Sequence, residues 1–232
     1  MAKTNLIFLP GLLCDETVWA HQVTGLSDIA EISVANFLGF DSLDAMAASV
    51  LAKAPEKFCI AGHSMGGRVA FEIMRQAPQR VERLALLNTH IHAKGQGEAE
   101  QRQVLVDLAY SDGMLALVGR WLPPMVHATR VFDEKLTAPL VKMFARATLE
   151  IFEKQVKALL NRRAAADLLP KISVPTLVLT GRQDSLGTVA QHEEIAAGIG
   201  GATLEIIERC GHMSIAEQPA AVTAALRNWL TR

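Results

Sequence analysis

Cysteine, net charge and long apolar runs are all scarce in this chain. Its three cysteines are an odd number among 232 residues, which excludes a fold held together by a framework of disulfides. A formal net charge of −1, with no block of like charges, does not favour nucleic acid or an anionic membrane as a partner. Because every apolar run is interrupted well short of the roughly 20 residues of a membrane span, we expect no membrane-spanning segment.

A signal-peptide pattern is also missing. Residues 1–4 run directly into the apolar segment 5–9, which leaves no room for a signal sequence followed by a linker. We therefore expect a cytoplasmic protein. Half of the residues are apolar, and a chain of this length accommodates one domain with a substantial core and a small inserted subdomain.

The most informative feature that is present is a serine at an abrupt change of pattern. Residues 62–66 read G-H-S-M-G, between the apolar segment 58–61 and a helical pattern over 68–76. A serine on so sharp a strand-to-helix turn has a strained backbone and an exposed hydroxyl, and glycines beside it avoid collisions that a Cβ would cause. The simpler interpretation of Ser64 is a helix N-cap, a position that favours serine.

This segment resembles the nucleophile elbow of the α/β-hydrolase superfamily. The resemblance implies that Ser64 is a nucleophile, and that an acid and then a histidine follow it in the chain. The implied acid is Asp184, which ends the G-R-Q-D segment 181–184 after the β-rich run 176–180. An Asx turn or a helix N-cap would also explain this aspartate, and another loop carboxylate is the alternative acid.

The histidine that the same resemblance implies is His212. It follows the alternating segment 203–207, and residues 211–219 match the superfamily's ending G-H-x-x-x-x-E-x-P. Such a histidine takes the proton of the serine, while the acid fixes the orientation of its ring.

An oxyanion hole made of two backbone N–H groups is implied as well. By position the donors are the N–H groups of Met65, directly after the serine, and of Leu12, in the early loop 10–13. This loop reads P-G-L-L, whereas the superfamily often has His-Gly there. The departure is mild because the donor is a backbone N–H and not a histidine ring.

Apolar segments typical of strands alternate with helical patterns along most of the chain. We predict strands near residues 5–9, 31–35, 57–61, 83–88, 175–180 and 203–207, and helices over 42–54, 65–76, 188–198 and 216–230. This alternation predicts an α/β fold, in which a mostly parallel sheet of about six strands has helices on both faces. The N-terminal antiparallel hairpin of the superfamily is largely missing.

Residues 91–169 interrupt the alternation and contain mainly helical patterns. The resemblance implies that they form a helical lid, inserted into a core of residues 1–90 and 170–232. The residues expected to line an apolar substrate pocket are Leu13 of the early loop and Trp121, Met125 and Phe144 of the insertion.

Some polar residues near these segments have a second interpretation. His90 and His92 alternate like strand residues and could ligate a metal, but no third ligand has a suitable spacing, so we expect no metal site. Four basic residues of the insertion could bind a substrate carboxylate, although we expect them on a solvated surface: Arg120, Arg130, Lys142 and Arg146.

The resemblance implies a serine hydrolase that needs no cofactor. An ester of small to medium size and partly apolar character is the expected substrate, and the protein is expected to be a monomer or homodimer. Carbon–carbon bond hydrolases, lactonases, thioesterases and lyases share the same constellation and are alternatives. A small-molecule receptor with vestigial activity is a further alternative, although such a receptor need not keep all three residues.

Overall fold

One parallel sheet of six strands forms the centre of the computed structural model, which describes residues 3–232. The strand order is β2-β1-β3-β4-β5-β6. The bounds are β1 Thr4–Leu9, β2 Ala30–Val34, β3 Phe58–His63, β4 Val81–Leu87, β5 Thr176–Gly181 and β6 Thr203–Ile207. The predicted fold class is confirmed, and each predicted strand agrees with the observed one to within two residues at either end.

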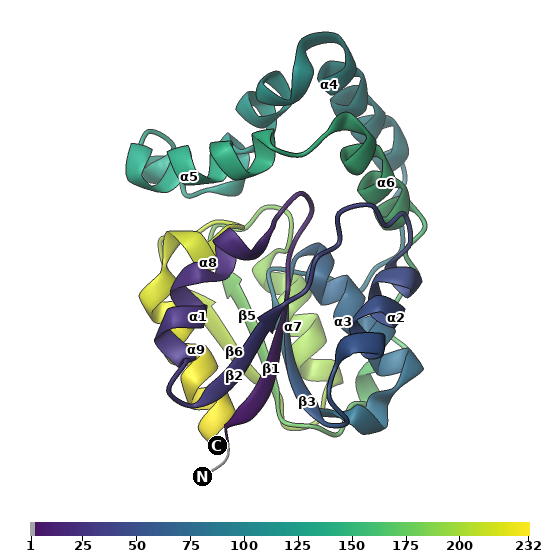
Figure 1. Cartoon of the computed structure of the whole chain (residues 1–232), viewed down its shortest axis with the longest axis vertical. Helices are drawn as coiled ribbons and strands as arrows, with labels where there is room; N and C mark the ends of the chain where they lie inside the picture. Colours follow the sequence, from purple (N-terminus) through teal and green to yellow (C-terminus); the bar gives the residue numbers. More distant parts are fainter. Residues whose placement is uncertain (1–2) are drawn as a thin grey trace.

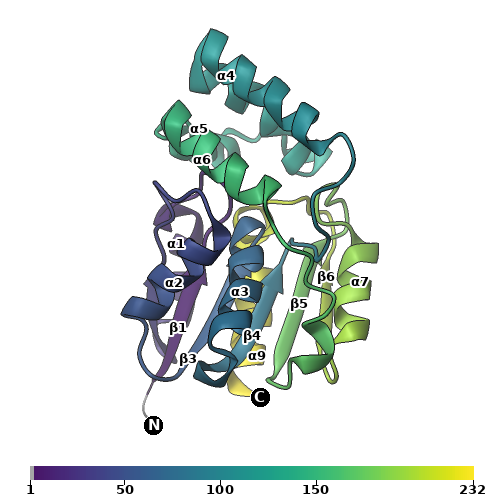
Figure 2. The ribbon, with the colours of Figure 1, turned by 90° about the vertical axis from the view of Figure 1, so that its right-hand side faces the viewer.

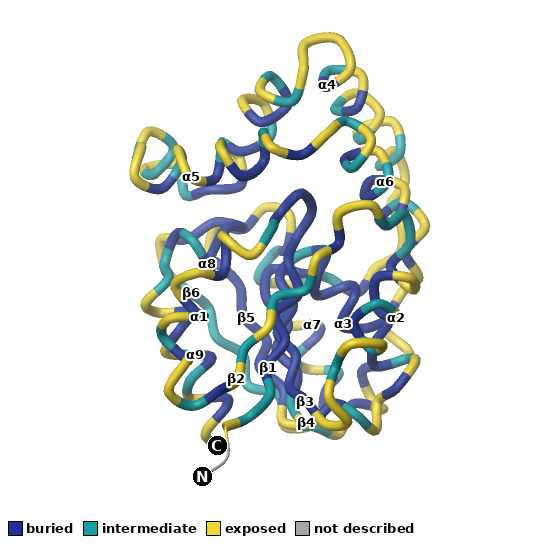
Figure 3. Tube along the Cα trace, in the orientation of Figure 1, coloured by how far each residue is buried: buried dark blue, intermediate teal, exposed yellow. Residues whose placement is uncertain are grey.

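Helices cover both faces of the sheet (Figures 1 and 2). One face carries α1 (Ala20–Leu26) and α9 (Pro219–Thr231), which also pack on each other. The other carries α2 (Leu43–Lys53), α3 (Met65–Gln76) and α7 (Val189–Gly198). This arrangement buries both faces of the central strands, so β1, β3 and β5 are mostly apolar runs, while the edge strands β2 and β6 are partly exposed (Figure 3).

Local sequence explains where several of these helices begin. The Ser42 hydroxyl accepts a hydrogen bond from the Ala45 N–H, as expected for an N-cap. Thr188 and Gln191 form a reciprocal capping box at the start of α7. The helix predicted over 216–230 is instead two helices, α8 (Ser214–Glu217) and α9, because Gln218 leaves the helical conformation and a proline begins α9.

Three helices of the insertion, residues 91–169, lie above the carboxyl ends of the strands (Figures 1 and 2). They are α4 (Glu98–Trp121), α5 (Glu134–Ala145) and α6 (Leu149–Leu160). Gly113, with φ 85° and ψ 172°, interrupts α4, and α5 contains Pro139. Apolar side chains such as Phe144 and Phe152 are buried between these helices and the core.

A buried glutamine connects the insertion to the core. Gln155 of α6 is fully buried; its Oε1 accepts from the Leu13 N–H at 2.8 Å, and its Nε2 donates to the Phe37 carbonyl at 3.1 Å. The glutamine thereby satisfies the Leu13 N–H, which has no other partner among the described residues, and adds a second hydrogen bond to the Phe37 carbonyl, which also accepts from the Phe40 N–H. The position of α6 is consequently linked to the loop that follows β1.

The strand β4 ends earlier than an alternating pattern through His90 and His92 suggests. Asn88 has φ 50°, which ends the extended conformation. The two histidine rings stack in the following loop with centroids 6.1 Å apart. Within residues 3–232 no group of three His, Cys, Asp or Glu side chains is placed to hold a metal ion. No helix in the same range is long and apolar enough to cross a membrane.

Candidate active site

Ser64 lies at the turn between β3 and α3, where the backbone is strained. It has φ 55° and ψ −115°, a region that non-glycine residues rarely occupy. Its N–H donates to the Leu87 carbonyl at 2.9 Å, which fixes the turn against β4. The hydroxyl makes no capping bond to α3. Its position thus differs from that of an ordinary N-cap serine.

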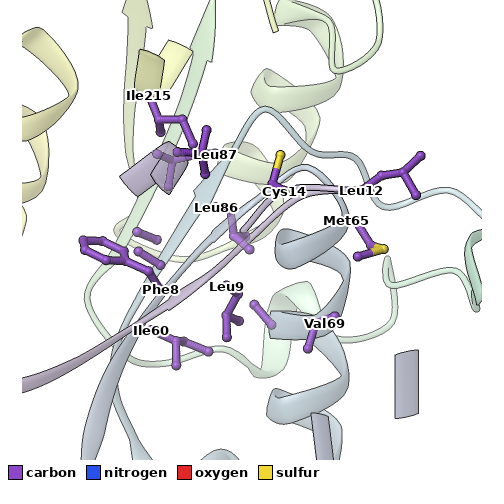
Figure 4. Packing of buried hydrophobic residues seen from close by; sticks show 14 of the residues in the cluster. Phe8, Leu9, Leu12, Cys14, Ile60, Met65, Val69, Leu86, Leu87 and Ile215 are labelled. Carbon is purple, nitrogen blue, oxygen red and sulfur yellow. The ribbon is translucent and has the colours of Figure 1, made fainter. Parts of the chain in front are cut away.

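Glycine is required at Gly66 because the loop after β1 passes directly over the first turn of α3 (Figure 4). A Cβ on Gly66 would overlap the carbonyl group of Leu9. We expect Gly66→Ala to lower the free energy of unfolding by about 3 kcal/mol or more, since a backbone group must move. Urea unfolding measures this change. Gly119→Ala is the control, because nothing lies within 4 Å of its added Cβ, and equal stability of the two variants would contradict the expectation.

The structure brings Ser64, His212 and Asp184 together from three loops at the carboxyl ends of β3, β6 and β5. His212 Nε2 lies 2.9 Å from Ser64 Oγ, and His212 Nδ1 lies 2.9 Å from Asp184 Oδ2. Asp184 and His212 are each 5% exposed. This continuous chain of hydrogen bonds has the geometry in which a histidine can remove the serine proton while a carboxylate orients its ring.

Several donors surround the Asp184 carboxylate. Its Oδ1 accepts from the N–H groups of Leu186 and Gly187, and its Oδ2 accepts from Asn88 Nδ2 at 2.9 Å. Burial by itself would raise the pKa of Asp184, but His212 and these hydrogen bonds lower it well below its usual value. The carboxylate therefore stays ionised at neutral pH.

Asn88 is a site residue that the sequence did not reveal. Its side chain lies behind Asp184, and Ser214 Oγ donates to Asn88 Oδ1, which leaves the amide nitrogen to face the carboxylate. Its positive φ distinguishes Asn88 from the strand residues before it, but a backbone angle cannot be read from the sequence. Asparagine does tolerate the left-handed region better than most residues.

The two expected oxyanion donors lie beside the serine. The N–H groups of Leu12 and Met65 have no hydrogen-bond partner among the described residues, and both residues line the same cavity as Ser64. The side chains of both are seen where the β1 loop meets α3 (Figure 4). Two such N–H groups beside the Ser64 hydroxyl form a suitable site for a developing negative charge.

A cavity of about 540 Å³ opens above these residues, between the core and the insertion. Trp121, Met125 and Phe144 line it, as expected from the sequence. Leu13 does not: the turn closed by the Cys14 N–H and the Gly11 carbonyl directs Leu12 to the cavity, while Leu13 is 2% exposed in the core.

The cavity also has a polar end that the sequence did not predict. Its lining there includes Arg68, His90, His92, Glu98, Arg102 and Arg162. The four basic residues that we expect on a solvated surface of the insertion are not among the lining residues: Arg120, Arg130, Lys142 and Arg146. For Arg68 a signal existed, since it lies four residues after Ser64 and therefore on the same side of α3.

A family model described as "Alpha/beta hydrolase family" matches residues 6–226. The chain belongs to this family. The 3-oxoadipate enol-lactonase 2 of Acinetobacter baylyi is 31% identical to this family member over 183 residues, which cover 75% of the chain and 63% of that protein. A 2-hydroxy-6-oxononadienedioate/2-hydroxy-6-oxononatrienedioate hydrolase of Cupriavidus pinatubonensis is 30% identical, with 75% and 62% covered. The chain thus spans somewhat less than two thirds of the length of these two relatives.

Solved structures of the alpha/beta hydrolase fold match this family member over its whole length. An esterase of Thermogutta terrifontis, solved with malate bound, superposes with a TM-score of 0.88 at 26% identity and covers 99% of the chain and 90% of that protein. The insertion and the sheet therefore have counterparts in a known enzyme of similar size.

His63, next to Ser64, is buried and neutral in this alpha/beta hydrolase family member. Its Nε2 donates to the His212 carbonyl oxygen at 2.8 Å, and its Nδ1 is buried without a partner among the described residues. Burial, followed by the nearby His212, lowers the pKa of His63 to about 3. In mild acid the His63 ring therefore binds a second proton in the unfolded chain but not in the folded protein.

The expected consequence is a loss of stability in mild acid. Between pH 6.5, the ordinary pKa, and pH 3 the unfolded chain binds a proton at His63 that the folded protein does not bind. The free energy of unfolding should therefore fall by about 1.4 kcal/mol per pH unit from this residue as the pH falls. Urea unfolding between pH 7 and pH 4 should show a shallower pH dependence for His63→Gln than for the wild type. Parallel pH profiles would refute this assignment.

Proposed function

We propose that this protein is a serine hydrolase that cleaves a carboxylic ester, including a cyclic one, through an acyl-enzyme. The observation that carries the proposal is the hydrogen-bonded chain Ser64–His212–Asp184, which ends at a cavity with two unpaired backbone N–H groups. The lactonase and esterase names of the relatives support the same reaction class.

The proposed reaction begins when Ser64 Oγ attacks the acyl carbon and His212 Nε2 takes the serine proton. The carbonyl oxygen then carries the negative charge and accepts hydrogen bonds from the N–H groups of Leu12 and Met65. His212 returns the proton to the departing alkoxide, which leaves the acyl group on the serine. Water then attacks the acyl carbon while His212 takes its proton, and His212 returns that proton to Ser64 Oγ as the acyl–serine bond breaks and the acid leaves. Asp184 keeps Nδ1 of His212 protonated throughout.

We further propose that the insertion is a lid. Residues of α4, α5 and their connection form the upper wall of the cavity, including Trp121, Met125 and Phe144. A wall of apolar side chains over the serine would exclude bulk water, which strengthens the electrostatic interactions within the site.

A second candidate reaction is hydrolysis of a 2-hydroxy-6-oxo dienedioate, the compound class in the name of the Cupriavidus relative. It would use the same three residues. Turnover of simple esters separates the two candidates, because only the first requires it.

The test of the proposed function uses a fluorophosphonate, whose phosphorus is attacked by an activated serine with release of fluoride. We expect one phosphonyl group per chain, located by mass spectrometry on the peptide that contains Ser64. His212→Ala should label far more slowly, and Ser64→Ala should not label. Hydrolysis of p-nitrophenyl esters from acetate to laurate then sizes the acyl pocket. Labelling at another residue, or equal labelling of the three proteins, would overturn the proposal.

A further inference from the structure

The polar end of the cavity carries more positive than negative charge. Three arginines line the cavity, Arg68, Arg102 and Arg162, against a single acidic residue, Glu98. The whole chain has a formal net charge of only −1, so this excess of positive charge is a local feature. The three arginines come from α3, from α4 and from the segment after α6.

Glu98 is fully occupied by its present partners. Arg162 binds it with both terminal nitrogens, Nη1 to Oε1 at 2.7 Å and Nη2 to Oε2 at 2.5 Å. The Gly95 N–H donates to Oε2 at 3.0 Å, and Arg102 Nε donates to Oε1 at 2.9 Å. One carboxylate therefore serves two guanidinium groups, and its acceptor sites are used.

Arg68 has no carboxylate partner within the described part of the chain. Its side chain is buried, and its terminal nitrogens donate to the carbonyl oxygens of His90, His92 and Arg163. Burial, and then the positive charge of Arg162, lower the pKa of Arg68 to about 9. A buried cation that is bound only by carbonyl groups keeps a desolvation penalty that an anion would offset.

Arg102 has donors that nothing in the described chain accepts. Its Nε is bonded to Glu98, whereas neither Nη1 nor Nη2 has a partner within residues 3–232. The side chain is 23% exposed and faces the cavity. In the same cavity, the Nδ1 of His90 is buried and has no partner among the described residues. Buried polar groups are normally hydrogen-bonded, so an occupant of this end of the cavity would supply a partner that His90 lacks.

We propose that this end binds a carboxylate of the substrate, so that the ester or lactone cleaved at Ser64 also carries a free carboxylate. Arg102 donates its free N–H groups to that carboxylate, and Arg68 supplies a second positive charge behind it. Arg68 begins one helical turn after Ser64, since its N–H donates to the Ser64 carbonyl oxygen. Ser64, Arg68 and Arg102 line the same cavity, so the reacting carbonyl and the carboxylate can belong to one substrate. The inference rests on the proposed serine hydrolase function.

The test compares two esters that differ only at the end of the acyl chain. Monophenyl glutarate ends in a carboxylate, and phenyl pentanoate has a methyl group in its place. We expect the wild type to hydrolyse the charged ester with at least tenfold higher kcat/KM. In Arg102→Gln the value for the charged ester should fall at least tenfold, mainly through KM, and that for the neutral ester should stay within twofold. Arg102→Lys should retain part of the preference, because it keeps the charge.

Arg120→Gln is the matched control, since Arg120 lies in the same helix but outside the cavity. A third ester, 3-carboxyphenyl pentanoate, has its carboxylate on the leaving group. Its kcat/KM is compared between wild type and Arg102→Gln, because that ratio does not depend on leaving-group chemistry. The proposal is supported if Arg102→Gln lowers kcat/KM for at least one of the two charged esters. It is overturned if the substitution lowers kcat/KM for neither of them. Ser64-dependent hydrolysis of phenyl pentanoate would in that case still support the serine hydrolase.

A binding measurement separates the two proposals when no ester is hydrolysed. In that case the proposed function fails, and the carboxylate site is tested by glutarate alone. At matched ionic strength, glutarate should raise the unfolding temperature of the wild type, and Arg102→Gln should show no increase. In a second series, added sodium chloride should reduce the increase that glutarate causes in the wild type. An equal response of both proteins, or no response in either, would overturn the carboxylate site.

Discussion

Ser64→Ala is expected to hydrolyse phenyl pentanoate at least about 10⁴-fold more slowly than the wild type. The substitution removes the only atom that would form a covalent bond to the substrate. It leaves the cavity and the N–H groups of Leu12 and Met65 in place, so binding should change little and the loss should be in kcat. Steady-state kinetics with an acyl-enzyme burst measured by stopped flow would show both effects, because the burst should disappear.

Ser185→Ala is the control for this experiment. Ser185 also lines the cavity, but it makes no hydrogen bond to His212. Its replacement should leave kcat within about threefold of the wild type. Comparable losses in the two variants would point to a general disturbance of the cavity and against a nucleophilic Ser64.

Asp184→Asn is expected to lower kcat by about 10⁴-fold, as the equivalent change does in serine proteases. Both oxygens of Asp184 accept hydrogen bonds, Oδ1 from two backbone N–H groups and Oδ2 from Asn88 and His212. An amide can keep the backbone bonds only by directing its NH₂ group at His212 Nδ1. That nitrogen would then have to be an acceptor, so Nε2 would carry the proton and could not remove one from Ser64.

Kinetics over pH 5–9, together with a thermal unfolding curve for each protein, would test this expectation. Asp167→Asn is the matched control, because Asp167 pairs with Arg75 on the surface and is remote from the cavity. Activity of Asp184→Asn near that of the wild type would mean that another carboxylate orients His212.

The elbow and the sheet were predictable because their constraints are local. A strand, a glycine, a serine and a helix follow one another within residues 58–76, and the close approach of Leu9 to Gly66 permits no larger residue. Asp184 and His212 each follow a strand that the alternating pattern predicts. Parallel strands end at the same edge of the sheet, so residues directly after them meet there.

The polar end of the cavity was not predictable in this way. Arg68, Arg102 and Arg162 are far apart in the sequence. Arg68 has a signal in its spacing from Ser64, but Arg102 and Arg162 each resemble an ordinary surface arginine of a helix or loop. Only the packing of α4 and α6 over the core brings them to one cavity. For the same reason nothing in the sequence indicates that Arg102 and Arg162 line the cavity.

Backbone conformation accounts for the remaining differences. Leu12 and Leu13 are identical residue types, and a tight turn sends them to opposite environments. A proline normally ends a helix, yet Pro139 lies inside α5, and α4 consists of two helical stretches that meet at a kink at Gly113. These features depend on how the insertion packs, which no periodic pattern expresses.

Gln155 limits how freely segments of this protein can be recombined with those of its relatives. A chimera that takes residues 91–169 from a relative with an apolar residue in place of Gln155 would bury the Leu13 N–H without its partner, while the Phe37 carbonyl would keep only the hydrogen bond from the Phe40 N–H. An orphaned buried N–H costs about 1–3 kcal/mol, and this one adjoins the Leu12 N–H. An exchanged insertion therefore has to keep a glutamine at position 155, so the sequences of the insertion and of the loop after β1 have to match each other.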